Sequence, residues 1–371
     1  MTEPPIPLVD LGIQHRRIAD EIRPELDAVL ETTAFVKGPA VEAFEREFAA
    51  YVGTDHCVGV ANGTDALELA LRSVGVGTGD RVVVPVNTFI ASAEAVVRAG
   101  ATPVLVDCEP DHQLIDVDRA VTAAGAHRAR AVIAVDLFGQ CAPLDELAAA
   151  LAGTGAVLVE DAAQSQGATH RGRGIGGVAA IAATSFYPGK NLGAYGDGGA
   201  VVTDRSDLAD QVRLLGDHGS RTRYVHEVVG TNSRLDTVQA VVLRAKLRRL
   251  DAWNAERAEA AQRYQDALAG TGIGLPRTAP DNGHVWHLFV VRVPRRDEVL
   301  NALHRSGIGA GIHYPVPIHL QPAFASLGHR PGDFPHAEEA AAEILSLPLY
   351  PGITPQQQDR VVAALLSALE R

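Results

Sequence analysis

Short apolar runs rich in β-branched residues alternate with amphipathic helical patterns through the first half of this 371-residue chain. A pattern with apolar residues three and four apart follows each run except the last. Such uninterrupted runs predict strands buried on both faces, as in a mostly parallel sheet covered by crossover helices. The sequence therefore predicts an α/β fold from five such runs, at 57–61, 81–85, 103–107, 129–138 and 156–161.

The pattern changes in the second half of the chain. A strand at 199–203 and a helix at 206–216 are followed by a long helical stretch at 235–269, whose arginine-rich face we expect to be exposed to solvent. The composition shifts near Gly270, and the last hundred residues indicate a smaller α+β unit.

The length of the chain exceeds that of one average hydrophobic core. We therefore expect three parts: an N-terminal arm at 1–15, a large α/β domain at 16–250 and a small C-terminal α+β domain at 251–371.

Composition argues against several classes of protein. The formal net charge is −12 and no basic block stands apart, so nucleic acid is not an expected partner. No apolar run is long enough to span a membrane and no signal peptide is evident, which favours a cytoplasmic protein without a membrane partner. The three cysteines are widely spaced and the histidines form no HExxH motif. We expect buried thiols and no metal site.

Lysine is scarce, since only Lys37, Lys190 and Lys246 occur among 33 basic residues. A shielded lysine can lose its proton and attack a carbonyl, whereas arginine keeps its proton. Lys190 lies in a glycine-rich turn, TSFYPGKNLGAYGDGGA, between two strand-like runs. Lys246 lies among arginines on a helical pattern, where we expect a solvated charge. Local sequence by itself favours an ordinary surface lysine at position 190 as well.

Ligands of open α/β sheets bind beyond the carboxyl ends of the strands, and one such turn here is ANGTDAL. Its residues Gly63 and Thr64 precede a helix, so their backbone N–H groups can bind a phosphate with help from the helix dipole. From this motif alone, simple capping of the helix by Asn62 or Thr64 is the favoured interpretation. Ser185 ends a later strand, where its hydroxyl can reach the same phosphate.

A second turn, VEDAAQSQGA, places Asp161 at the tip of a buried strand. Because burial of a lone carboxylate is costly, Asp161 requires a cationic partner from the protein or from a ligand. A helix cap or a core salt bridge are the alternatives. Phe89, at a further strand-to-helix turn, offers an aromatic face to the same region, with a core position as the equal alternative.

The segment GRGIGG (172–177) matches the dinucleotide-binding pattern GxGxxG. A β-branched run follows it instead of a helix, so no helix N-terminus is available to bind a phosphate. We therefore predict a turn.

An acid at a strand tip, a phosphate cradle, an aromatic plate and a scarce lysine together meet the requirements of pyridoxal phosphate. The chain resembles the DegT/DnrJ/EryC1/StrS family of sugar aminotransferases over essentially its whole length. The motifs that carry the resemblance are FVKGPAVEAFE, ANGTDAL, EDAAQSQGA, SFYPGKNLGAYGDGG, GTNSRLDTVQAVVL and GIHYPVPIHLQPAF. The resemblance implies the aspartate aminotransferase-type fold (fold type I), pyridoxal phosphate as cofactor with its aminated form (PMP) during turnover, and a homodimer with active sites at the subunit interface.

The resemblance also implies roles for individual residues. Lys190 would form the Schiff base and Asp161 would face the pyridine nitrogen, with Gln164 near the ring hydroxyl and Phe89 stacked on the ring. Gly63, Thr64 and Ser185 would hold the phosphate, together with Asn232 from the neighbouring subunit. Candidate contacts to the nucleotide sugar are Tyr187, His218, Arg221, Tyr224, His313, Tyr314 and His319, each with an equal alternative as a core or surface residue.

The loop KNLGAYGDGG resembles members that aminate the 3-position of nucleotide-linked 6-deoxy-3-keto sugars. The resemblance thus implies transfer of an amino group from L-glutamate to a dTDP-linked 3-keto-6-deoxyhexose. A 4-keto-sugar aminotransferase and a sugar dehydratase are the alternatives within the family, although dehydratases have histidine where this chain has Lys190. A cofactor-sensing regulator and a nicotinamide-dependent oxidoreductase are the alternatives outside it.

Overall fold

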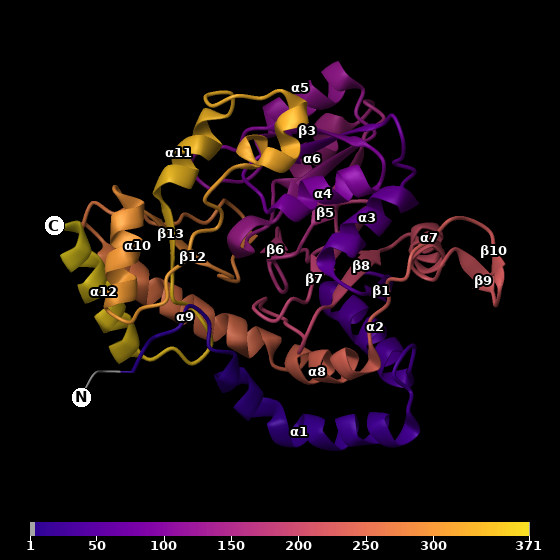
Figure 1. Ribbon diagram of the computed structural model, residues 1–371, viewed down its shortest axis with the longest axis horizontal. Helices are drawn as coiled ribbons and strands as arrows, with labels where there is room; N and C mark the ends of the chain where they lie inside the picture. Colours follow the sequence, from indigo (N-terminus) through magenta and orange to yellow (C-terminus); the bar gives the residue numbers. More distant parts are fainter. Residues whose placement is uncertain (1–3, 371) are drawn as a thin grey trace.

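The computed structural model describes residues 4–370, which are organised around a seven-stranded sheet in the order β1-β8-β7-β5-β4-β2-β3 (Figure 1). Strand β8 is antiparallel to both of its neighbours, and every other pairing in this sheet is parallel. The expected mostly parallel sheet is therefore confirmed. The strands are β1 (His56–Val60), β2 (Arg81–Pro85), β3 (Thr102–Val106), β4 (Ala131–Val135), β5 (Val157–Asp161), β7 (Ile181–Ser185) and β8 (Gly199–Thr203).

Helices cover both faces of this sheet, which explains why its strands are apolar throughout. In β2, Val82 and Val84 enter the core beneath one layer of helices, while Val83 enters the core beneath the other. The first layer contains α3 (Gly63–Ser73), α4 (Ile90–Arg98) and α7 (Ser206–Gly216). The second contains α2 (Pro39–Val52), α5 (Val117–His127), α6 (Leu144–Leu151) and α8 (Thr237–Leu247).

A second core lies on the side of the molecule where both termini emerge (Figure 1). It forms between the antiparallel pair β12 (Phe289–Arg292) and β13 (Ile344–Leu347) and the helices α9 (Leu250–Leu268), α10 (Arg296–Arg305) and α12 (Pro355–Leu369). Ile6 joins this core, and its backbone N–H donates to the Gly307 carbonyl at 2.9 Å. The N-terminal arm is thus attached to the C-terminal region before α1 (Leu11–Thr32) begins.

The C-terminal region also packs against the main sheet. Phe324, in the 3-10 helix η3 (Pro322–Leu327), and Ala337, in α11 (Pro335–Glu343), share the core of α3 and α4. The backbone N–H of Ile318, which opens η2 (Ile318–Leu320), donates to the carbonyl of Val86 just beyond β2. Because one core joins both regions, a division of the chain at residue 250 stays a prediction.

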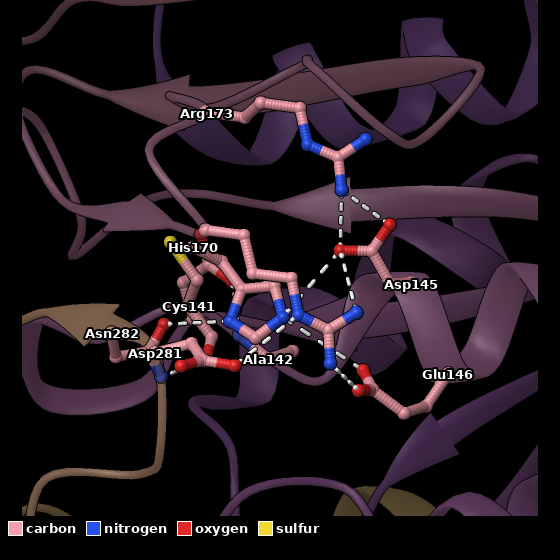
Figure 2. A network of polar contacts seen from close by, with 10 residues as sticks. Cys141, Ala142, Asp145, Glu146, His170, Arg173, Asp281 and Asn282 are labelled. Carbon is pink, nitrogen blue, oxygen red and sulfur yellow. Dashed lines mark hydrogen bonds and ion pairs between the residues drawn. The ribbon is translucent and has the colours of Figure 1, made fainter.

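The GRGIGG segment follows β6 (Thr169–His170) in a region held by polar contacts (Figure 2). Gly172 and Arg173 are exposed, whereas Ile175 and Gly176 are buried. Arg173 forms an ion pair with Asp145 of α6, and His170 Nδ1 lies 3.2 Å from Asn282 Oδ1 of β11 (Asn282–Gly283). No helix follows the segment before β7, so the predicted turn is confirmed.

The long helical stretch differs from expectation in two respects. It divides at Arg248 and Arg249 into α8 and α9, and it buries two cations that we expected to be solvated. Lys246 is 2% exposed, and so is Arg257. Both side chains end on backbone carbonyls, which accept their N–H groups. Two basic residues of this stretch therefore donate hydrogen bonds to carbonyls inside the protein, a role that a helical pattern alone does not reveal.

Three remaining features concern the surface and the thiols. The hairpin of β9 (Ser220–Thr222) and β10 (Val225–His226) projects away from the body of the molecule (Figure 1). The cysteines Cys57, Cys108 and Cys141 are buried and free, as expected. Among residues 4–370, no helix combines the length and apolar character needed to cross a membrane.

Arg257 provides a test of this packing. Its guanidinium donates to the carbonyls of Trp286, His287 and Leu349 at 3.4, 3.4 and 3.0 Å. We expect Arg257→Met to lower the free energy of unfolding by about 1–3 kcal/mol, because buried carbonyls lose their donor. Arg263→Met, on the exposed side of the same helix, should change it by less than about 0.5 kcal/mol. Urea unfolding measures both values, and equal values would contradict the assigned role.

Candidate active site

A cavity of about 850 Å³ opens at the carboxyl ends of the parallel strands. Residues just beyond β1, β2, β5 and β7 line it, because parallel strands all end at the same edge of the sheet. The loops at 287–288 and 313–314 close it from the C-terminal region, and Leu8 and Val9 of the N-terminal arm complete the wall. The cavity is therefore formed by segments far apart in the sequence, from Leu8 to Tyr314.

Lys190 projects into this cavity from the loop between β7 and β8. Its backbone N–H donates to the Tyr187 carbonyl at 2.9 Å, which closes a tight turn. Burial disfavours the ammonium form and lowers the pKa of Lys190 to about 8, although the negative charge of Asp161 opposes this shift. A substantial neutral fraction near physiological pH makes Lys190 suited to nucleophilic and proton-transfer chemistry.

Asp161 ends β5 and is 4% exposed. Its Oδ2 accepts a hydrogen bond from Ser92 Oγ at 2.7 Å, and its Oδ1 accepts one from the Ala163 N–H at 3.2 Å. Burial raises the pKa of this carboxyl group, while the two hydrogen bonds and the charge of Lys190 lower it. Within the described part of the chain no ion pair to Asp161 is formed. The carboxylate thus faces the cavity without the cationic partner that its burial calls for.

The neighbouring Glu160 belongs to a separate buried group on the other side of the strand tip. Its Oε2 accepts the Gly176 N–H at 2.8 Å, and burial raises its pKa well above the usual value, with the charge of Asp136 adding to the effect. Asp136 accepts hydrogen bonds from the Ala142 N–H and from a serine hydroxyl, and burial raises its pKa to about 6. These carboxyl groups hold the loops after β4 and β5, and they do not line the cavity.

Helix α3 begins at Gly63, and its first turn faces the cavity. The side chain of Asn62 caps this helix by accepting the Asp65 N–H at 2.8 Å, which leaves the N–H groups of Gly63 and Thr64 without intrahelical partners. A Cβ atom on Gly63 would lie 2.6 Å from the Ser185 Cβ. Glycine at position 63 therefore lets β7 approach the helix, so that Ser185, Gly63 and Thr64 line one end of the cavity together.

Aromatic and amide side chains form an adjoining wall. Phe89 is 49% exposed towards the cavity and its ring centroid lies 5.2 Å from that of Tyr314. The Tyr314 hydroxyl accepts a hydrogen bond from Gln164 Nε2 at 3.1 Å, and Gln164 Oε1 accepts the Phe138 N–H at 2.7 Å. The amide orientation of Gln164 is thus fixed from the side away from the cavity.

Two histidines on the C-terminal side line the cavity in neutral form. His313 Nδ1 lies 2.8 Å from Ser346 Oγ, and burial lowers its pKa to about 4, with the charge of Lys190 adding to the effect. Burial also lowers the pKa of His287 well below the usual value. His287 Nδ1 lies 3.1 Å from Asn191 Oδ1, next to Lys190 in sequence. Neither imidazole therefore adds a positive charge beside Lys190 and Asp161, and the other charged residues that line the cavity are Glu94, Arg98 and Asp197.

Comparison with known proteins places this arrangement in a family. The model of the DegT/DnrJ/EryC1/StrS aminotransferase family matches residues 16–366. This chain belongs to that family. The resemblance noted in the sequence is thereby confirmed, and so is an aminotransferase fold with a large, mostly parallel α/β sheet.

Named relatives support the assignment. The chain is 48% identical to a dTDP-3-amino-3,4,6-trideoxy-α-D-glucose transaminase of Streptomyces venezuelae, over 99% of this chain and 97% of the relative. It superposes with a TM-score of 0.96 on the crystal structure of S. venezuelae DesV in complex with ketimine intermediate, at 48% identity and full coverage of both chains. NtdA from Bacillus subtilis with bound cofactor PMP gives a TM-score of 0.89 at 29% identity, covering 100% of this chain and 86% of that chain.

The structure brings most of the predicted site residues of this family member into one place. The cavity is lined by Gly63, Thr64, Phe89, Asp161, Gln164, Ser185, Tyr187, Lys190, His313 and Tyr314. Their roles towards a cofactor or substrate stay predictions.

Five predicted residues lie elsewhere. His218, Arg221 and Tyr224 lie on or beside the projecting β9–β10 hairpin and Asn232 follows it, all outside the cavity of their own chain. His319 is 3% exposed and pairs with Glu338 at 3.0 Å, so the substrate contact expected for it does not fit its position. Its imidazole instead lies between η2 and α11, where its ring packs edge-on against Phe334 and its Nε2 lies 3.0 Å from Glu338 Oε1.

Sequence reasoning missed other residues that line the cavity. Ser92, which donates to Asp161, lies three positions after Phe89 at the start of α4, so helical spacing indicated it. His287 and the arm residues Leu8 and Val9 carried no such signal, because distant segments bring them to the cavity. Among residues 4–370, no group of three or more His, Cys, Asp or Glu side chains is arranged to hold a metal ion.

The ionisation of Lys190 is directly testable. In the ligand-free full-length protein, acetylation of Lys190 should reach half its maximal rate near pH 8, whereas an ordinary lysine does so at about 10.4. Asp161→Asn should shift this midpoint lower, because the carboxylate favours the ammonium form. Peptide mass spectrometry of trace-labelled protein across pH 6–11 measures both midpoints, with the Lys37 peptide as internal standard. A wild-type midpoint above pH 10 would contradict the buried environment.

Proposed function

We propose that this chain is a pyridoxal phosphate-dependent aminotransferase that moves an amino group from L-glutamate to the 3-position of a dTDP-linked 3-keto-6-deoxyhexose. The observation that carries the proposal is the pairing of a partly neutral lysine with a buried carboxylate that lacks a cation, beside a helix N-terminus. The similarity to a transaminase named for a dTDP-3-amino sugar supports the substrate class.

The residues of the cavity fit the coenzyme. The Asp161 carboxylate suits a protonated pyridine nitrogen, which would supply the positive charge that no residue between 4 and 370 provides in an ion pair. The free N–H groups of Gly63 and Thr64 and the Ser185 hydroxyl suit a phosphate at the start of α3. The ring of Phe89 is placed to stack on the ring of the coenzyme, and the amine of Lys190 is suited to react with the aldehyde of the coenzyme.

The chain's own groups would then perform the transfer. Bound here, pyridoxal phosphate supplies an electron-withdrawing ring that stabilises negative charge on an adjacent carbon. Lys190, with a pKa of about 8, is roughly one-tenth neutral at pH 7, so its amine accepts a proton and its ammonium returns it. Asp161 would maintain the positive charge on the ring nitrogen of the coenzyme. Phe89 and Tyr314, whose ring centroids lie 5.2 Å apart in the wall of the cavity, would exclude water from one face of the site.

We also propose a cytoplasmic homodimer with shared active sites. The hairpin residues His218, Arg221 and Tyr224, together with Asn232, lie outside their own cavity but carry groups suited to phosphate and nucleotide. A site shared between subunits would give them that role, with Asn232 at the coenzyme phosphate of the neighbouring subunit. The free, buried cysteines agree with a reducing compartment.

One experiment tests the proposed reaction. The protein, loaded with pyridoxal phosphate, is incubated with L-glutamate and a panel of nucleotide-linked 3-keto and 4-keto sugars, and the new amine is located by NMR. We expect amination at the 3-position of dTDP-linked 3-keto-6-deoxyhexose. Amination at the 4-position or release of ammonia would favour the 4-keto aminotransferase or the dehydratase instead. Lys190→Ala should abolish turnover because the proton carrier is lost, whereas Lys37→Ala should retain it.

The close approach of β7 to α3 gives a second test. We expect Gly63→Ala to weaken pyridoxal phosphate binding at least about tenfold, because a Cβ atom 2.6 Å from the Ser185 Cβ must displace part of the phosphate cradle. Gly77→Ala is a matched control, since a Cβ there meets no atom within 4 Å. Absorbance titration of the coenzyme-free proteins gives both Kd values. Equal Kd values for Gly63→Ala and wild type would argue against phosphate binding at this helix.

A further inference from the structure

Lys246 is a buried cation close to the loop that carries Lys190. It lies in the last turn of α8, and its Nζ donates to the Gly193 carbonyl at 2.6 Å. Its ammonium also lies 4.9 Å from the centre of the Tyr195 ring, within cation–π range. Both contacts are made to the segment just after Lys190, so α8 and the reactive loop are joined at this point.

This cation is costly to keep buried. No carboxylate forms an ion pair with Lys246 in residues 4–370, and burial lowers its pKa to about 8. A methionine of similar length would fill the same space without the cost of removing a charge from water. Loss of the hydrogen bond to the Gly193 carbonyl would oppose this gain, so stability favours lysine only weakly, and a strong, directed hydrogen bond to the loop gives a better reason for it.

The tight fold of the loop between β7 and β8 links the hydrogen bond at Gly193 to the position of Lys190. A Cβ atom on Gly193 would lie 2.3 Å from the Pro188 carbonyl oxygen and 2.9 Å from that of Tyr187, so the loop folds back tightly on itself. Tyr187 in turn accepts the Lys190 N–H at 2.9 Å. Because no space remains between the two sides of the loop, movement of Gly193 displaces the turn that holds Lys190.

We propose that Lys246 is a positioning residue for Lys190, acting through the carbonyl of Gly193. The inference rests on the proposed function, in which Lys190 is the reactive amine. A displacement of about 1 Å can cost on the order of 100-fold in rate when a reacting group must be aligned. Neutral contacts also hold the loop, such as Tyr195 N–H to Gln239 Oε1 at 2.8 Å and Asn191 Nδ2 to Asn254 Oδ1 at 2.8 Å. These contacts remain in a Lys246 variant and keep the loop folded.

Hydrogen exchange of the coenzyme-free full-length protein tests the physical link independently of any substrate. We expect Lys246→Met to speed amide exchange in 187–195 by about tenfold, because the loop loses its charge-assisted anchor, and to leave exchange in β5 unchanged. Lys246→Arg, which keeps a charged donor, should restore part of the protection. Arg248→Met is the matched control, since Arg248 lies just beyond the same helix and pairs with Glu21 on α1. Unchanged exchange in 187–195 overturns the proposal.

Kinetics of the coenzyme-loaded protein then test whether the link reaches Lys190. We expect Lys246→Met to lower kcat by about 10–100-fold with KM for the keto sugar little changed. In a Lys190→Ala background whose activity is restored by methylamine, the same substitution should have less than about twofold effect, because a free amine needs no positioning. An equal loss in both backgrounds identifies a general structural defect and overturns the proposal. Where methylamine restores no activity, the exchange result decides.

If wild-type protein aminates none of the nucleotide sugars, the proposed function fails while the exchange experiment still gives its answer. A failure of the proposed function can therefore be told apart from a failure of the positioning role of Lys246.

Discussion

The electrostatic interaction between Lys190 and Asp161, which both line the cavity, is the interaction on which the site depends. Burial disfavours the charged form of each group, raising the pKa of the acid and lowering that of the amine, and each charge partly offsets the shift of the other. No ion pair within 4.0 Å joins them in the described chain, so neither neutralises the other completely. Within residues 4–370 the site is thus left with a partly neutral amine and with an acid that lacks a cation in an ion pair.

The topology of the sheet brings these groups together. Asp161 ends β5, which is paired with β7, and β7 leads into the loop that carries Lys190. The chain then returns in β8, the strand of this sheet that runs opposite to the other six, so the loop is anchored to the sheet at both ends. Hydrogen bonds also join α8 and α9 to the loop, at Gly193, Tyr195 and Asn191. The reactive amine is therefore held by rigid elements, which favours a preorganised site.

Much of this was predictable, because strand ends and helix starts are local features. Runs of β-branched residues located the sheet, and the residues at or just beyond their ends included Gly63, Asp161 and Ser185, which line the cavity. The errors concern long side chains. Lys246 and Arg257 follow a helical pattern typical of a solvated face, yet both end on carbonyls contributed by distant segments, Gly193 and Leu349. Similarly, His319 lies near a recognisable motif but faces Glu338 and the core.

The sequence by itself determined the class of fold, the scarce lysine and the ends of the strands, because these depend on the order of apolar and polar residues along a short stretch. The tertiary structure decided which side chains meet. It placed His287 and the arm residue Leu8 at the cavity, left Asp161 without an ion pair, and buried Lys246 beneath the reactive loop. Burial sets the cost of a charge, and burial depends on segments far apart in the sequence, so the chemistry of these groups emerged only when the chain was folded.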